Sequence, residues 1–146
     1  MNISVEDLRD IKFLKYYRLV RKWAAKTNGI TESDLELLIY LDALERFTIN
    51  DFKEGTYIYT WDKHRWSRFK KNGWVVVWRS ADRKSGKHNI YAVSLKTKML
   101  ITRMYRILLG KEDLPTSRVN VFYENKTYTD KVMNKAMDDM LKDKDR

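Results

Sequence analysis

Apolar residues recur every three or four positions in four long parts of the chain, and this spacing predicts four helices. The first is capped by Ser4 and ends before Gly29, because glycine readily adopts the left-handed conformation found at helix ends. Its apolar arc is so wide that we expect a second subunit to cover part of it, although a long helix lying across its own domain would also explain the pattern. The predicted helices are residues 4–28, 33–45, 97–109 and 129–141. Thr31 is expected to cap the second, with Asp34 in its first turn, and Thr129 to cap the last.

Between the second and third of these helices the hydrophobic pattern changes its period. A short extended piece at 47–49 comes first, followed by one or two helical turns that Asn50 caps. A helix over about 61–72 then ends at Gly73. After it, two runs rich in β-branched and aromatic residues predict a hairpin, and the polar link between them is too long for a tight turn. The predicted strands are residues 74–79 and 89–94.

Two aromatic residues predict how the helix at 61–72 lies on its domain. Trp66 and Phe69 are three residues apart, so both side chains point to the same face and belong in the core. The opposite face is then polar and strongly basic. Its expected residues are Lys63, His64, Ser67, Arg68 and Lys71, with Arg65 and Lys70 on its flanks.

Positive charge is concentrated around this helix and the hairpin. The whole chain carries a net charge of +10, and residues 61–98 alone hold 11 Lys and Arg against 2 Asp, a net charge of +9. Such a block on an otherwise nearly neutral chain is typical of a surface that binds a polyanion, whereas an isolated charge run is usually a solvated face. The hairpin contributes Arg79, Arg83, Lys84, Lys87 and His88 to this block.

The residue types that are missing exclude several classes of protein. The chain has no Cys, which excludes disulfides, thiolate metal sites and Cys nucleophiles. It has no apolar run of about 18 residues and no leader-like segment, so we expect a soluble, cytoplasmic protein without a membrane partner. No phosphate-binding glycine loop, metal-spaced histidines or nucleophile elbow is present, and His64 and His88 lie in basic surroundings. We therefore expect neither an enzyme nor a cofactor or metal.

The order of the predicted elements is that of a winged helix-turn-helix. In such folds the third helix of a three-helix core enters the major groove of DNA, and a hairpin touches a neighbouring groove or the backbone. We predict a mainly α fold with a small β-hairpin wing, in a single domain over residues 1–146. Within it, residues 30–98 would form the DNA-binding core, and residues 1–29 and 99–146 a helical dimerisation region.

Four stretches of the chain resemble the MarR-type family of transcriptional regulators, which are small dimeric winged-helix proteins. The resemblance implies a homodimer in which the first and last helices pair with those of a second subunit. The chain departs from the family's pattern at Phe52-Lys53, Lys96 and Met99, so a divergent member, for example a phage-encoded one, is expected. The stretches are ITESDLELLIYL (30–41), RFKKNGWVVVWR (68–79), ADRK (81–84) and YAVSLKTK (91–98).

These residues predict specific roles on double-stranded DNA. Arg68 is expected to reach a base edge, because its guanidinium fits guanine O6 and N7. His64 and Ser67 would read bases or hold phosphates, and Arg83 would enter the minor groove. The predicted phosphate contacts are Lys70, Lys71, Arg79, Lys84 and Lys87. The full set of predicted DNA-binding residues is Lys63, His64, Arg65, Ser67, Arg68, Lys70, Lys71, Arg79, Arg83, Lys84, Lys87 and His88.

Other functions remain open at this point. Winged helices also serve as protein-interaction modules, for example on RNA polymerase, and Trp61, Trp74 and Trp78 would suit such an interface because Trp is enriched at binding hot spots. The density of lysine speaks against it, since lysine is depleted at protein interfaces. RNA binding through stacked aromatic residues is a weaker variant. The sequence specifies neither a target site nor a small-molecule effector.

Overall fold

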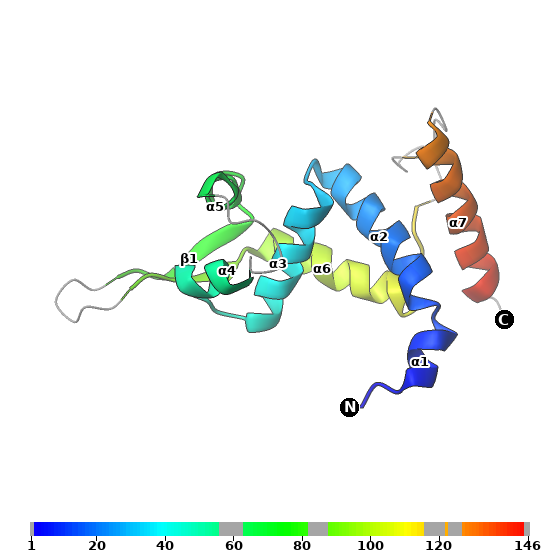
Figure 1. The fold of residues 1–146 in the computed structure, drawn as a ribbon, viewed down its shortest axis with the longest axis horizontal. Helices are drawn as coiled ribbons and strands as arrows, with labels where there is room; N and C mark the ends of the chain where they lie inside the picture. Colours follow the sequence, from blue (N-terminus) through cyan, green and yellow to red (C-terminus); the bar gives the residue numbers. More distant parts are fainter. Residues whose placement is uncertain (1, 56–62, 82–87, 116–121, 123–126, 145–146) are drawn as a thin grey trace. The chain divides into compact units, whose positions relative to one another are not determined.

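The computed structural model divides the chain into two compact units (Figure 1). One unit is Thr31–Ile101, and the other joins Met1–Ile30 to Thr102–Arg146. The described parts contain seven helices and one antiparallel sheet of two strands, so the fold is mainly α-helical with a small β-hairpin. The residues that the structure describes are 2–55, 63–81, 88–115, 122 and 127–144.

The described part of the Thr31–Ile101 unit contains three helices, the two strands of the hairpin and the start of a further helix. Figure 1 shows the three helices grouped at one end of the hairpin, whose strands extend away from them. The last helix of the unit, α6, continues into the other unit. The elements are α3 (Glu32–Leu44), α4 (Ile49–Gly55), α5 (Lys63–Lys71), β1 (Val75–Arg79), β2 (Ile90–Val93) and α6 (Leu95–Leu108).

Helix α3 begins where its sequence predicts. The Thr31 hydroxyl accepts a hydrogen bond from the backbone N–H of Asp34 at 3.1 Å and so satisfies one of the free donors of the first turn. Glu32 and Asp34 lie in that turn, where acidic residues suit the positive end of the helix dipole. The apolar stripe of the helix forms the core of the unit. Its fully buried residues are Leu35, Leu37, Leu38 and Leu41.

Helix α4 is capped two residues earlier than predicted. Thr48, and not Asn50, is the capping residue: its hydroxyl accepts from the Asp51 N–H at 3.2 Å, and the Asp51 carboxylate accepts from the Thr48 N–H at 2.9 Å. This reciprocal pair satisfies two backbone N–H groups, those of Thr48 and Asp51, whereas a single capping side chain satisfies one. Phe52 of this helix is fully buried.

The hairpin is antiparallel and has a short third partner. Val75 pairs with Val93 and Val77 with Tyr91, and the register shifts at a bulge between Val77 and Arg79. Phe47 pairs with Tyr91 from the other side, through two backbone hydrogen bonds of 2.9 and 2.8 Å. The predicted extended piece at 47–49 is thus confirmed at Phe47, and it ties the start of α4 to β2.

Aromatic side chains join α4, α5 and the hairpin. Trp66 and Phe69 are 6% and 1% exposed, which confirms their predicted place in the core. The Trp66 ring lies 4.7 Å from that of Phe52 and 4.8 Å from that of Tyr91, measured between centroids. Phe69 also meets Phe52, at 6.0 Å. Edge-to-face and tilted contacts of this kind add to the free energy of burial.

In the other unit, the predicted helix at 4–28 is wrong in one respect: it is two helices, α1 (Val5–Asp10) and α2 (Phe13–Asn28). The predicted caps are both present, because Ser4 forms a capping box with Asp7 and Gly29 is left-handed. The break falls at Lys12, whose φ is 48°. The spacing of apolar residues continues unchanged through Lys12, so the sequence pattern does not indicate a break. The Lys12 ammonium pairs with Asp143, which is too distant in the sequence for the pattern to reveal.

Helix α7 (Tyr128–Lys144) runs along α2 with oppositely charged residues facing one another. The pairs are Lys12–Asp143 at 2.8 Å, Lys15–Asp139 at 3.2 Å and Lys26–Asp130 at 3.0 Å, so α2 and α7 are antiparallel. The predicted cap Thr129 is wrong. Thr127 caps the helix instead, through reciprocal bonds with Asp130 of 3.1 and 3.4 Å.

The first residues of the chain keep much of their apolar surface exposed. Leu8 is 43% exposed and Leu14 is 60% exposed, although both belong to the predicted apolar arc. Within this chain the arc is therefore only partly covered, and the expected second subunit stays a prediction. None of the described helices combines the length and the apolar character that crossing a membrane requires.

Replacing Trp66 by Ala is expected to lower the free energy of unfolding by about 3–5 kcal/mol, because it opens a cavity among buried rings. Trp78→Ala is the matched control: Trp78 is 48% exposed, and its loss is expected to cost about 1 kcal/mol or less. Urea unfolding followed by circular dichroism measures both. Equal losses for the two variants would contradict the assigned core.

The Lys26–Asp130 contact predicts how stability depends on pH. The hydrogen bond from Lys26 holds the pKa of Asp130 below its ordinary value. A lowered folded pKa means that the contact stabilises fully above the unfolded pKa of about 3.9 and loses its effect as the pH falls through the folded pKa. Asp130→Asn should therefore destabilise the protein at pH 7 and progressively less below about pH 4. Urea unfolding of both proteins at pH 7 and below pH 4 measures this. The same loss of unfolding free energy at the two pH values would contradict the prediction.

Candidate nucleic-acid interface

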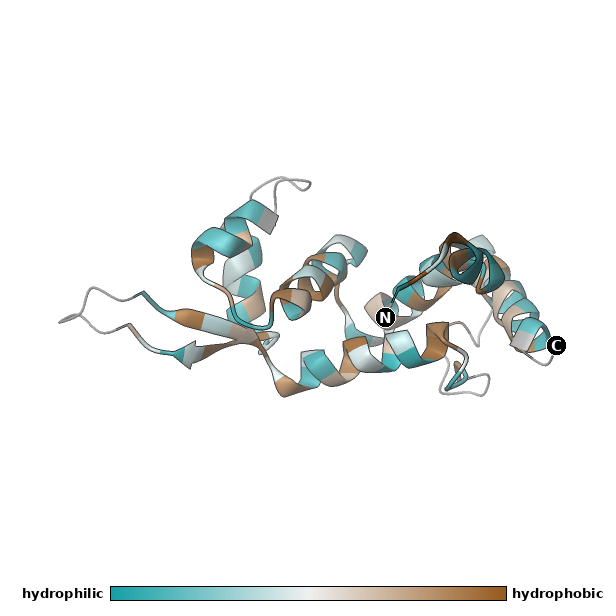
Figure 2. Cartoon of the chain, turned by 90° about the horizontal axis from the view of Figure 1, so that it is seen from below, coloured by the Kyte–Doolittle hydropathy of each residue, from teal (hydrophilic) through white to brown (hydrophobic). Residues whose placement is uncertain are grey.

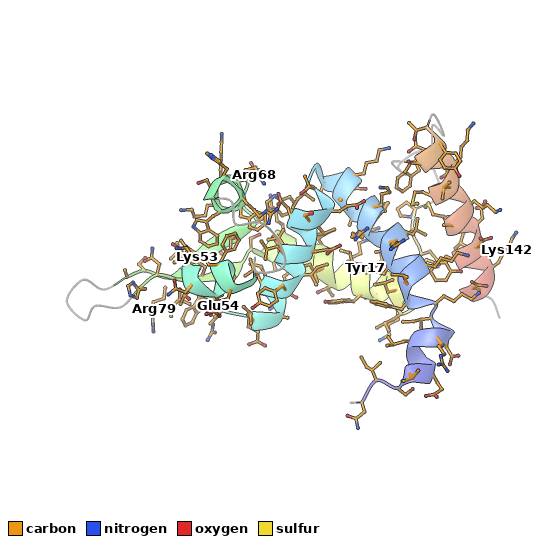
Figure 3. The ribbon with its side chains drawn as sticks, viewed as in Figure 1. Tyr17, Lys53, Glu54, Arg68, Arg79 and Lys142 are labelled. Carbon is orange, nitrogen blue, oxygen red and sulfur yellow. The ribbon has the colours of Figure 1, made fainter. Side chains whose placement is uncertain are left out.

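Helix α5 presents a polar, basic surface because its two aromatic residues are buried. His64, Ser67 and Lys71 are exposed, and they lie on the side of the helix away from Trp66 and Phe69. The predicted basic outer face is therefore present for these residues. Figure 3 shows side chains reaching out from this helix around Arg68.

Lys70 is exposed as well, and it lies at the border between the two faces. Its Nζ is 5.7 Å from the centroid of the Trp66 ring. A lysine over an indole ring is attracted to it and keeps its charged end in water. Lys70 is thus held close to the outer face, as predicted for a residue on its flank.

Asp34 of α3 is buried, and its carboxylate meets two arginines of α5. Its Oδ1 is 2.7 Å from Arg65 Nε, and its Oδ2 accepts a hydrogen bond from Arg68 Nη2 at 3.1 Å. Arg65 and Arg68 are three residues apart on the helix, which is why both reach the same group. The sequence placed Asp34 in the first turn of α3 but offered no sign of this partnership.

The two arginines differ in their exposure. Only 14% of the Arg65 side chain is exposed, so its predicted place on the outer flank of α5 is wrong. Its ion pair with Asp34 instead connects α5 to α3. Arg68 keeps 47% of its side chain exposed, so it pairs with Asp34 and still faces solvent.

The hairpin adds two of the predicted residues to the described surface. Arg79, at the end of β1, and His88, just before β2, are both exposed. Figure 3 labels Arg79 on the strand. The structure does not describe the side chain of Lys63, and the predicted residues Arg83, Lys84 and Lys87 lie outside the described residues altogether.

An exposed tryptophan on the hairpin was not among the predicted DNA-binding residues. Trp78 is 48% exposed, and the guanidinium of Arg46 lies 3.8 Å from its ring centroid, with that of Arg79 at 5.9 Å. Hydrophobic residues continue along both strands (Figure 2). Of the three tryptophans considered as partner anchors, Trp74 is buried, Trp61 lies outside the described residues, and Trp78 is accessible.

Lys96 closes the junction between α5 and the hairpin. Its Nζ donates to the backbone carbonyl of Asn72 at 2.6 Å and lies 4.1 Å from the centroid of the Trp74 ring. Gly73 makes the turn with φ 74°, a conformation that suits glycine. A cation at the carboxyl end of a helix also favours the helix dipole. The sequence identified Gly73 as the helix end but not Lys96 as its partner.

A hollow in the unit formed by Met1–Ile30 and Thr102–Arg146 is lined by acidic residues, so it does not suit nucleic acid. Its volume is about 370 Å³, and its four charged lining residues are all acidic. Phosphate groups would be repelled there. The rest of the lining is mostly apolar and comes from α2, α6, α7, Ile11 and the residues that follow α6. Within the described residues, no three His, Asp or Glu side chains are grouped as metal ligands would be. The acidic residues are Asp10, Glu112, Asp113 and Asp143.

No protein-family model, curated protein or solved structure matches the chain. The resemblance to MarR-type regulators therefore stays a prediction from the sequence. The basic face of α5 and the exposed part of the hairpin are the features from which a function can be inferred.

Lys96→Met is expected to lower the free energy of unfolding by about 1 kcal/mol, because it removes a cation–π contact and the donor to the end of α5. Lys71→Met is the control: it removes an equally exposed lysine and is expected to change stability by less than about 0.5 kcal/mol. Urea unfolding measures both. The same loss in the two variants would show that Lys96 does not close this junction.

Proposed function

We propose that the protein is a sequence-specific, double-stranded DNA-binding regulator that acts as a homodimer. Helix α5 would enter the major groove, and the hairpin would lie on the backbone or in the minor groove. The observation that carries this proposal is the burial of Trp66 and Phe69, because it turns His64, Ser67 and Lys71 outward together.

The arrangement of the Thr31–Ile101 unit supports a winged helix-turn-helix. Helices α3, α4 and α5 come in succession, and Phe52 of α4 packs on both aromatic residues of α5. The hairpin follows α5 directly, joined by a hydrogen bond of 2.9 Å from the Trp74 N–H to the Phe69 carbonyl. The resemblance to MarR-type regulators favours the same interpretation of this order.

The proposed DNA contacts are of two kinds, to base edges and to phosphates. Arg68 is the residue we propose for a guanine edge, since its guanidinium can donate two parallel hydrogen bonds to O6 and N7. Lys70, Lys71 and Arg79 would neutralise phosphates, which position the protein without reading the sequence. For a dimer that neutralises about ten phosphates, the logarithm of affinity should fall with the logarithm of salt concentration with a slope of about −9.

The homodimer is proposed on the exposed apolar residues at the start of the chain. Val5, Leu8, Phe13 and Leu14 are each at least 42% exposed, and all four line the same shallow hollow at the junction of α1 and α2. A surface of this kind on a water-facing helix is expected to pack against another protein surface. A two-fold dimer would place two copies of α5 about one turn of DNA apart.

A protein-interaction module is the second candidate, and the exposure of Trp78 favours it. Trp78 follows the exposed residues Val76 and Val77 in β1, and the Arg46 guanidinium lies over its ring. Tryptophan and arginine are enriched among the residues that dominate protein interfaces. A partner such as a polymerase subunit would then bind the hairpin, and DNA affinity would be non-specific.

Selection of bound duplexes from a random pool is expected to yield a two-fold symmetric site. On that site Arg68→Ala should lose about 1–3 kcal/mol of binding free energy, while its affinity for random duplex changes much less. Arg106→Ala, which removes an exposed arginine from the other unit, is the control and should bind like the unchanged protein. A pool without enrichment, or equal losses on selected and random duplex, would contradict sequence-specific binding.

A further inference from the structure

The contact between Asp34 and the arginines of α5 bears on which DNA groups Arg68 can bind. Asp34 is 4% exposed and comes from α3, so it lies at the base of the proposed interface rather than on it. Its backbone N–H is bonded to the Thr31 hydroxyl, which fixes the first turn of α3, and its carboxylate Oδ1 is 2.7 Å from Nε of the mostly buried Arg65. The carboxylate therefore occupies a fixed position.

Arg68 approaches this fixed carboxylate with one part of its guanidinium. Its Nη2 donates a hydrogen bond to Asp34 Oδ2 at 3.1 Å, and 47% of the side chain is exposed. A guanidinium is planar and carries five N–H donors, so one edge can be held by a carboxylate while another faces outward. Asp34 thus restricts the orientation of a side chain that would otherwise be flexible.

The charge of Asp34 also affects what binds the outward edge. The Asp34 carboxylate offsets one of the two positive charges of Arg65 and Arg68, so a phosphate at Arg68 is attracted less strongly than it would be without Asp34. The edge of guanine offers two acceptors, O6 and N7, without a net charge. Asp34 therefore shifts the preference of Arg68 away from a phosphate and toward a neutral pair of acceptors.

We propose that Asp34 is a positioning residue that sets the specificity of α5: it orients Arg68 toward a guanine edge and disfavours a phosphate there. This inference rests on the proposed function, since it concerns the same helix and the same DNA. In this proposal Arg65 does not contact DNA; it pairs with Asp34 and holds the carboxylate in place.

The test compares four full-length proteins on two duplexes at one salt concentration. The duplexes are the one selected from a random pool and one of random sequence. The variants are Asp34→Asn, which removes the charge while keeping the shape, Glu45→Gln, which removes one negative charge from an exposed end of the same helix, and Arg68→Lys. Circular dichroism checks that each variant is folded.

Asp34→Asn is expected to bind random duplex more tightly and to lose about 5- to 150-fold in its preference for the selected site. Damage to the fold would weaken binding to both duplexes, so a gain on random duplex separates a positioning role from a structural one. Glu45→Gln should keep the preference of the unchanged protein. Replacing the guanine opposite Arg68 by 7-deazaguanine should weaken binding of the unchanged protein and leave Asp34→Asn nearly unaffected.

Arg68→Lys keeps the inference testable if Asp34→Asn does not fold. Lysine carries the same charge but has no fork, so it cannot bridge a carboxylate and a base edge. Its preference should fall while its affinity for random duplex is kept. If Asp34→Asn folds and still prefers the selected duplex as strongly as the unchanged protein, the inference is overturned and the proposed function stands. If Asp34→Asn does not fold, an unchanged preference in Arg68→Lys has the same meaning. If the unchanged protein prefers no duplex, both are overturned.

Discussion

The contact of Trp66 and Phe69 with Phe52 and Tyr91 is the constraint on which the rest of the Thr31–Ile101 unit depends. Two rings on one side of α5 bury that side, and the polar residues between them have only the opposite side left. The same cluster connects α4 to β2, so the position of the helix and that of the hairpin are set together. The basic surface is thus a consequence of core packing.

Electrostatics then divides the basic residues of α5 into two kinds. Arg65 is used inside the protein, where it pairs with the buried Asp34, whereas Lys71 and His64 stay in solvent. Arg68 belongs to both, since it meets Asp34 and is half-exposed. A count of charges along the sequence treats these residues as equivalent, although burial of one carboxylate makes them different.

The sequence predicted the features that depend on neighbours in the chain. Helix α3 with its cap Thr31, the hairpin and the inward direction of Trp66 follow from spacing and from local capping chemistry. The features it missed depend on distant residues or on reciprocal pairs. Lys12 breaks the first helix beside Asp143, Arg65 is drawn inward by Asp34, and Lys96 returns to Asn72 from α6. Periodicity carries no information on such contacts.

Lysine footprinting with and without the selected duplex is the most direct measurement of the central claim, that the outer face of α5 contacts DNA. We predict that acetylation of Lys70 and Lys71 slows strongly when duplex is present, while Lys131 and Lys135 of α7, which are also exposed, react as before. Protection of the α7 lysines with unchanged reactivity on α5 would contradict it.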